Sequence, residues 1–172
     1  MYPITYLGTS IDSVSSVYST STFFYDPSDN SVTADLFKGT ATAAYYADLA
    51  ERYEADAVYE PGTVLVIGGN KEVTVTSDFS DTKVIGVVST NPAYMMNAAA
   101  GSDDTHPYIA LRGRVPVKVV GTVLRGDLLV TSAFPGYAQA YDAATCNPNA
   151  VFAKALGSNT SGYGVVESVI IG

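Results

Sequence analysis

Four acidic side chains lie close together in the sequence, where paired carboxylates could do acid–base chemistry. They are Asp48, Glu51, Glu54 and Asp56. Two neighbouring carboxyl groups push their pKa values apart, so that one can donate a proton while the other accepts one. The same spacing is also typical of a solvated acidic face. We favour the solvated face as the interpretation of this cluster.

A second group of charged residues is basic. Arg112, Arg114 and Lys118 lie in a stretch from 106 to 126 that contains no acid. Residues 111–119 alternate with period two, which predicts a strand with one apolar face and one cationic face. The cationic face could bind a phosphate, a sulfate or an anionic glycan. It could also meet the acidic N-terminal segment of a neighbouring chain. We favour that contact because the first sixty residues carry nine acids and two bases, which complement the basic stretch.

Other kinds of chemistry lack the residues they need. The chain has a single histidine, His106, and a single cysteine, Cys146. These two residues cannot form a metal-ligand set, and they give no specific catalytic triad with any of the serines. We therefore expect no metal site, no cofactor and no enzymatic activity.

The elements that carry these residues follow a repeated pattern of turn and apolar strands. The first copy has a Pro-Gly turn at 61–62 and strands at 64–67, 73–76 and 84–88; the second has a turn at 125–127 and strands near 128–131, 138 and 151–156. The segment LRGRVPVKVVG joins the two copies. This repetition predicts a mainly β fold, a compact barrel-like or sandwich-like domain of two repeated hairpin units over residues 56–172.

Residues 1–55 form a different kind of segment, rich in Ser, Thr and Tyr. The turn residues at 26–30 predict a hairpin between strands near 23–25 and 31–37. Residues 42–54 show helical spacing and predict a short helix. An isolated hairpin is marginally stable in water, so this extension should dock onto another surface or onto copies of itself. The aromatic residues expected in that interface are Phe23, Phe24, Tyr25, Phe37, Tyr45 and Tyr46.

Composition excludes several classes of function. The formal net charge is −8, whereas nucleic-acid-binding proteins normally carry a basic surface. No apolar run approaches the roughly 20 residues that cross a bilayer, and the N-terminus lacks the features of a signal peptide. We expect no nucleic-acid partner, no membrane insertion, and synthesis in a reducing cytoplasm.

Several motifs in order resemble those of a known group of proteins. They are YADLAERYE, PGTVLV, IGVVSTNP, GRVPVKV and GDLLVTS, and the likeness extends over roughly residues 20–172. The chain resembles virion structural proteins of contractile-tailed bacteriophages, particularly the terminal β domain of fibre-like proteins. The resemblance implies a non-enzymatic component of the tail, fibre or baseplate region. It also implies a homotrimer that contacts other virion proteins and is made in the host cytoplasm.

A shorter motif is similar to the self-cleaving C-terminal chaperone domain of phage neck appendage proteins. The matching positions are Asp48, Ala50 and Glu51, followed by the aromatic Tyr53. This resemblance implies cleavage near Ala47–Asp48, with Asp48 and Glu51 as the participating acids.

Two further functions remain open from the sequence. The chain could recognise a host-surface glycan through the loop at 97–107 and the cationic strand. It could also be a capsid decoration protein. Both alternatives belong to the same virion context as the structural role.

Overall fold

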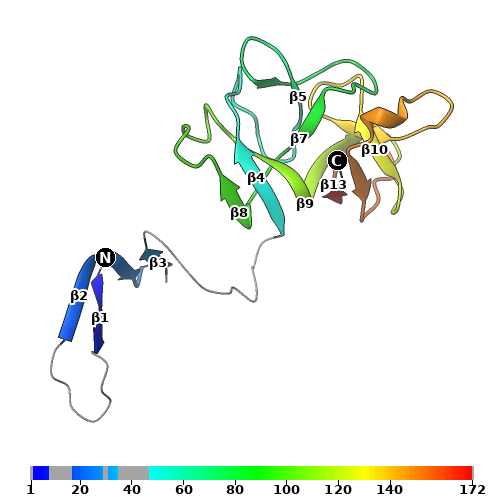
Figure 1. Ribbon diagram of the computed structural model, residues 1–172. Helices are drawn as coiled ribbons and strands as arrows, with labels where there is room; N and C mark the ends of the chain where they lie inside the picture. Colours follow the sequence, from blue (N-terminus) through cyan, green and yellow to red (C-terminus); the bar gives the residue numbers. More distant parts are fainter. Residues whose placement is uncertain (1, 8–16, 29–30, 35–46, 172) are drawn as a thin grey trace. The chain divides into compact units, whose positions relative to one another are not determined.

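The computed structural model describes residues 2–7, 17–28, 31–34 and 47–171 (Figure 1). The chain divides into two compact units, residues 1–43 and residues 44–172. The fold is nearly all β, as the sequence predicts.

The first unit contains a three-stranded antiparallel sheet with the order β1-β2-β3. Its strands are β1 (Tyr2–Leu7), β2 (Val17–Asp26) and β3 (Ser31–Ala34). The predicted hairpin is confirmed, because β2 and β3 pair from Phe23↔Ala34 to Asp26↔Ser31. At the turn, the backbone N–H and the hydroxyl of Ser28 both donate to Asp26 Oδ1, at 3.0 and 2.7 Å. These two bonds lower the pKa of the Asp26 carboxyl.

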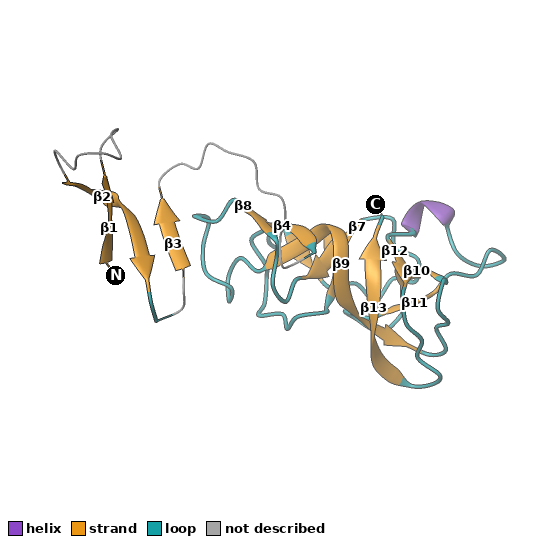
Figure 2. Cartoon of the chain, turned by 90° about the horizontal axis from the view of Figure 1, so that it is seen from below, coloured by secondary structure: helices purple, strands orange, loops and turns teal. Residues whose placement is uncertain are grey.

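The second unit contains ten strands and one 3-10 helix among its described residues. The elements are β4 (Asp48–Arg52), β5 (Val64–Ile67), β6 (Val73–Thr74), β7 (Val84–Val88), β8 (Tyr94–Met96), β9 (Tyr108–Val120), β10 (Leu128–Thr131), β11 (Ala138–Ala140), η1 (Pro148–Ala150), β12 (Ala153–Ala155) and β13 (Tyr163–Ile170). The thirteen-residue strand β9 is the longest of them and crosses the middle of the unit (Figures 1 and 2).

Five strands form a closed barrel in the order β9-β13-β12-β10-β11. Neighbours in this order are antiparallel, and the parallel pairing of Ala138 with Val119 closes the ring. Val115, Val117 and Val119 of β9 point into the core, which confirms the predicted period of two. The residues between them form the outer face of the strand.

The remaining strands form a second ring of pairings. β4 pairs with β9, β9 with β7, β7 with β5, and β5 with β6. A parallel bridge between Val73 of β6 and Ala55, in the segment after β4, closes this second ring. β9 therefore belongs to both rings: residues 108–113 pair with β4, and residues 113–120 pair with β13. β8 extends the second ring through a parallel pairing with β4.

The predicted repetition is confirmed by these pairings. In the first copy β5 lies between β6 and β7, and in the second copy β10 lies between β11 and β12. Each central strand follows a turn with a glycine in the left-handed region, Gly62 at φ 85° and Gly126 at φ 96°. Only glycine adopts this region readily. Residues 125–127 therefore form the turn before β10, which corresponds to the turn before β5 in the first copy.

The predicted helix over 42–54 is wrong where the structure describes it, because residues 48–52 form the strand β4. Residues 42–46 lie outside the described residues. Along β4, Asp48 and Ala50 are buried while their neighbours are partly exposed, so the burial has the period of a strand. Pairing with β8 on one side and β9 on the other overrides the local helical preference. β4 consequently belongs to the second unit, although the sequence placed these residues in the N-terminal extension.

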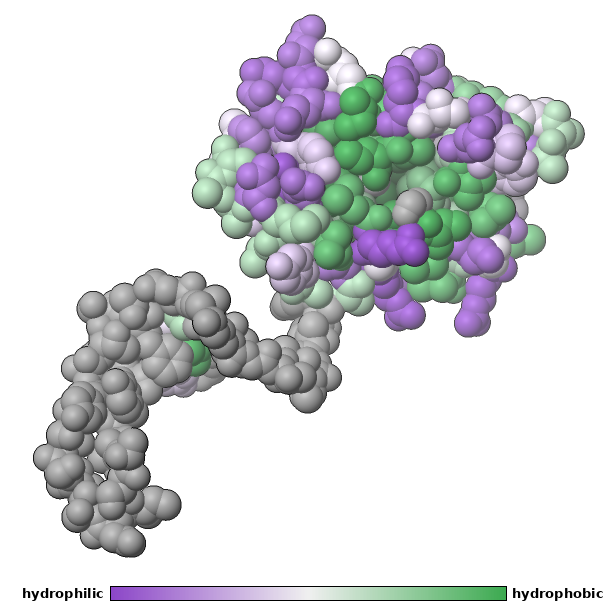
Figure 3. All heavy atoms as spheres, in the orientation of Figure 1, coloured by the Kyte–Doolittle hydropathy of each residue, from purple (hydrophilic) through white to green (hydrophobic). Residues whose placement is uncertain are grey.

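Apolar side chains fill both rings and also reach the surface. One buried cluster is formed mainly from the barrel strands, and a second includes Leu65, Val73, Val88 and Ile109. Figure 3 shows further apolar residues, in green, side by side on the visible face of the second unit. Tyr94, Tyr163 and Val165 are each at least 60% exposed.

Candidate functional site

The site is built around Asp48, the first residue of β4. This aspartate is only 5% exposed, and its strand position lies opposite Gly113 of β9. The hydroxyl of Ser89, which directly follows β7, donates to Asp48 Oδ2 at 2.6 Å. Charged side chains are rarely buried without such a partner. A buried carboxyl with a single short side-chain bond is therefore a candidate for chemistry.

Burial raises the pKa of the Asp48 carboxyl above its ordinary value, and the hydrogen bond from Ser89 opposes this effect. The carboxyl lies at a cavity of about 250 Å³. Two charged side chains from neighbouring strands, Arg114 of β9 and Glu167 of β13, line the same cavity. Their nearest atoms, Arg114 Nε and Glu167 Oε1, lie 3.9 Å apart. The surroundings favour a protonated Asp48 over a wider pH range than an exposed aspartate has.

The backbone on both sides of Asp48 is held by hydrogen bonds. The N–H of Arg114 donates to the carbonyl oxygen of Ala47 at 3.0 Å. The N–H of Ala93 donates to the carbonyl oxygen of Asp48 at 2.8 Å. The peptide bond between Ala47 and Asp48 is thus held in place next to a buried carboxyl.

Gly113 allows the close approach of this peptide bond to β9. Its φ is 103°, and a Cβ atom at this position would lie 2.1 Å from the Ala47 carbonyl oxygen. Such a distance is far inside van der Waals contact. Only glycine therefore fits between β9 and the Ala47 carbonyl without a backbone shift.

Glu51 does not join Asp48 at this site. Positions 48 and 51 face opposite sides of β4, because side chains alternate along a strand. Glu51 Oε2 instead accepts a hydrogen bond of 2.9 Å from the hydroxyl of Tyr53. Burial and this contact raise the pKa of Tyr53 to about 12. The predicted pair of participating acids is not brought together within the chain.

The other two acids of the cluster also have partners of their own. Glu54 accepts from Lys71 Nζ at 2.7 Å, and Asp56 accepts from the hydroxyl of Tyr59. These contacts lower the pKa of both carboxyl groups. The four acids therefore do not converge, and Asp48 alone among them is buried.

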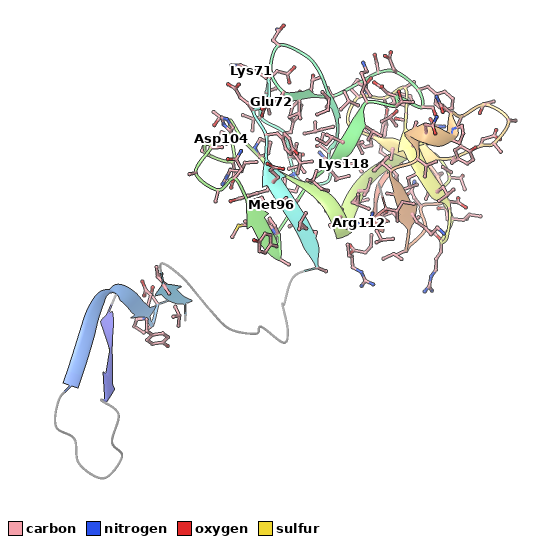
Figure 4. All side chains as sticks on the ribbon, viewed as in Figure 1. Lys71, Glu72, Met96, Asp104, Arg112 and Lys118 are labelled. Carbon is pink, nitrogen blue, oxygen red and sulfur yellow. The ribbon has the colours of Figure 1, made fainter. Side chains whose placement is uncertain are left out.

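The three cations of β9 each contact a group of their own chain. Arg112 Nη1 donates to the carbonyl oxygen of Ile171 at 2.9 Å. Lys118 Nζ contacts Glu60 Oε2 at 3.1 Å and Thr63 Oγ1 at 3.0 Å. Figure 4 shows Arg112 and Lys118 at different places along β9. Their predicted role toward an anionic glycan or a neighbouring subunit, together with that of Arg114, stays a prediction.

The predicted interface residues fall mostly where side chains are not described. Phe23, Phe24 and Tyr25 lie in β2, and of these three the structure describes the side chain of Tyr25, which is 38% exposed. Tyr25 pairs with Val32 of β3, which is 57% exposed. Phe37, Tyr45 and Tyr46 lie outside the described residues.

Sequence reasoning missed Ser89 and Gly113. The serine lies 41 positions from its carboxylate partner, and the motif IGVVSTNP that contains it does not indicate this contact. The glycine interrupts an otherwise alternating strand pattern, and an isolated glycine within a strand is a signal for a close backbone approach. That signal could have identified Gly113.

Among residues 2–7, 17–28, 31–34 and 47–171, no group of three or more His, Cys, Asp or Glu side chains is placed to hold a metal ion. Within the same residues, no helix has the length and apolar character to span a membrane.

Comparisons with known proteins show what the fold resembles. No protein-family model and no curated protein matches the sequence. Among solved structures, the chain is similar to the pre-mature gene product 12 of bacteriophage phi29, with a TM-score of 0.54 and 16% sequence identity. The match covers 87% of this chain and 24% of the phage chain. The chain thus spans about a quarter of that protein's length, and the two share a fold.

Proposed function

We propose that the chain is a non-enzymatic structural component of a bacteriophage virion, in the tail, fibre or baseplate region. The fold that it shares with a phage protein supports this role, as does the apolar surface of the second unit. Soluble monomers rarely expose large contiguous apolar patches unless the patches bind something. The partners in this proposal are copies of the chain itself and other virion proteins.

The observation that carries the proposal is the exposed cross-strand pair of Tyr25 and Val32. Residues directly opposite each other in an antiparallel pair lie on one face of the sheet. These two therefore place aromatic and aliphatic surface together on one face of the first unit. A three-stranded sheet needs its apolar face covered to be stable. Three copies that cover one another's faces would form the homotrimer.

Light scattering on the purified chain tests this assembly. We expect a particle of about three times the 18.0 kDa chain mass. Val32→Asp places a charge on the proposed interface and should produce monomers with a folded second unit. Thr160→Asp is the matched control, because it adds the same charge at an exposed residue of the second unit, away from the proposed interface. A wild-type monomer at micromolar concentration, or equal behaviour of both variants, would contradict the proposal.

A second candidate function is self-cleavage at Ala47–Asp48, as in a chaperone domain that is removed after assembly. The specific observation in its favour is the buried Asp48 carboxyl beside the Ala47–Asp48 peptide bond, whose carbonyl oxygen accepts a hydrogen bond from the N–H of Arg114. This bond lies at the start of the second unit, before the first strand of its sheet. Cleavage there would release the second unit with all of its strands intact.

The chemistry needs only groups that the chain supplies and water. The protonated Asp48 carboxyl attacks the carbonyl carbon of Ala47 through its carbonyl oxygen, closing a six-membered ring, while its proton passes to the Asp48 nitrogen. The bond between this carbon and this nitrogen breaks, leaving a free amine and a mixed anhydride between Ala47 and the Asp48 side chain. Water then hydrolyses the anhydride, which restores the Asp48 carboxyl and leaves a carboxylate on Ala47.

Intact-mass measurements over time test the second candidate. We expect fragments of residues 1–47 and 48–172 from the wild-type chain. Asp48→Asn keeps the size of the side chain and a partner for Ser89 but removes the acid, so this variant should stay whole. A wild-type chain that remains intact, or an Asp48→Asn variant that is cleaved equally fast, rejects this function.

A further inference from the structure

We propose that Ser89 is a positioning residue for Asp48 and that the N–H of Arg114 is the donor that polarises the Ala47 carbonyl during self-cleavage. This inference rests on the second candidate function. Both groups lie in motifs quoted from the sequence, IGVVSTNP and GRVPVKV, but those motifs alone do not indicate these roles.

Ser89 is held firmly enough to fix another side chain. It is 9% exposed, and its own N–H donates to the carbonyl oxygen of Tyr108 at 2.8 Å, which ties it to β9. Its hydroxyl, just beyond the end of β7, donates to Asp48 Oδ2 at 2.6 Å. The bond restrains rotation of the Asp48 side chain and so limits the directions in which its carboxyl oxygens point. A restrained nucleophile needs less reorganisation before it attacks.

The Arg114 N–H already points at the oxygen on which charge develops when the Ala47 carbonyl is attacked. The distance of 3.0 Å between N and O is suitable for an oxyanion donor. Gly113 makes this approach possible, since a side chain there would collide with the Ala47 oxygen. The pairing of β4 with β9 also shifts register between Leu49 and Ala50. Such irregularities often lie beside active sites, where they redirect backbone groups.

Burial raises the pKa of Asp48, and hydrogen bonds from Ser89 and from the backbone at Asp48 and Ala93 oppose this effect. The charged side chains that share the cavity with Asp48 are Arg114 on β9 and Glu167 on β13. Ser89 adds a neutral donor that lowers the pKa of Asp48. Because the attacking group is the protonated carboxyl, cleavage should slow as pH rises through the Asp48 pKa. Loss of the Ser89 hydroxyl should move this decline to higher pH.

The test follows cleavage of the full chain by intact mass across a pH series. We expect Ser89→Ala to slow cleavage by about 10- to 100-fold, in line with the loss of a hydrogen bond to an ionisable group. It should also shift the decline in rate to higher pH. Ser89→Thr keeps a hydroxyl and should restore much of the rate. Thr90→Ala is the matched control, because Thr90 lines the same cavity and is exposed.

The positioning role of Ser89 and self-cleavage itself can fail independently in this test. A wild-type chain that never cleaves overturns both. If the wild type cleaves and Asp48→Asn does not, self-cleavage stands. In that case, an unchanged rate and an unchanged pH profile in Ser89→Ala overturn the positioning role alone. A folded Ser89→Ala variant, checked by its circular dichroism, excludes unfolding as the cause of a slower rate.

Discussion

Ala55, three residues beyond the end of β4, forms a parallel bridge with Val73. The bridge corresponds to the parallel pairing of Ala138 with Val119, which closes the barrel. The two halves of the second unit are therefore closed in the same way, one by the segment after β4 and the other by β9. The repeated motif that the sequence shows in its turns and strands extends to the manner of closure.

Because β9 pairs with strands of both rings, we expect the two rings to unfold together. Leu65 and Leu129 are fully buried, one in each apolar cluster. Leu65→Ala and Leu129→Ala should each lower the free energy of unfolding by about 2–5 kcal/mol. Leu124→Ala, at a position that is 55% exposed, should change it by about 0.5 kcal/mol or less. Denaturant unfolding followed by circular dichroism should give a single transition, and two separate transitions would contradict the prediction.

Gly113→Ala should destabilise the second unit more than Gly121→Ala does. Both glycines have positive φ, 103° and 79°, so an alanine costs about 1–2 kcal/mol at either position. At Gly121 a Cβ atom meets nothing within 4 Å, whereas at Gly113 it collides with the Ala47 oxygen. The extra loss of unfolding free energy in Gly113→Ala over Gly121→Ala therefore measures the collision with the Ala47 oxygen. Equal losses would show that β9 and the segment before β4 move apart easily.

Part of this fold could be predicted from local sequence patterns. The period of two in β9 and the repeated Pro-Gly and Arg-Gly turns are local patterns, and the structure confirms them. The segment at 48–52 has a local preference for helix but lies between two partner strands that are distant in sequence. The contact of Ser89 with Asp48 likewise depends on tertiary pairing. Local patterns carry no information about such contacts. The sequence therefore indicated Asp48 but not its neighbours Ser89 and Gly113.

Asp48→Asn should change how the free energy of unfolding depends on pH. Burial raises the pKa of Asp48 in the folded state above 3.8, so the folded state binds the proton more tightly than the unfolded chain. Stability from this group is therefore present at low pH and is lost as pH rises from 3.8 through the raised value. The variant lacks this loss and should be more stable than the wild type at neutral pH, by an amount that shrinks on acidification.

Asp56→Asn is the control of opposite sign. The hydrogen bond from Tyr59 lowers the pKa of Asp56, so this carboxylate stabilises the fold above 3.8 and loses its effect as pH falls. This variant should be less stable than the wild type at neutral pH, and the gap should narrow on acidification. Urea midpoints from about pH 3 to neutral measure both trends. The same direction in both variants would contradict the assignment.

Arg52→Lys should loosen the loop before β9. The Arg52 guanidinium lies 4.0 Å from the centre of the Tyr108 ring, bonds Asp103 Oδ1 at 2.8 Å and donates to the carbonyl oxygen of His106. Lysine cannot reproduce this planar set of contacts, so a loss of about 1–3 kcal/mol is expected. Hydrogen exchange should accelerate at residues 105 and 106. Arg125→Lys, at an exposed position, should leave exchange there unchanged.

The length of β9 has a consequence for how this unit can be divided. A break in the middle of β9 would remove from each ring a strand with which its neighbours pair, so we expect neither half to fold alone. Domain-dissection experiments should therefore keep residues 48–171 together. A split pair of fragments should regain its shape only when both pieces are mixed, which would make the unit suitable as a complementation reporter.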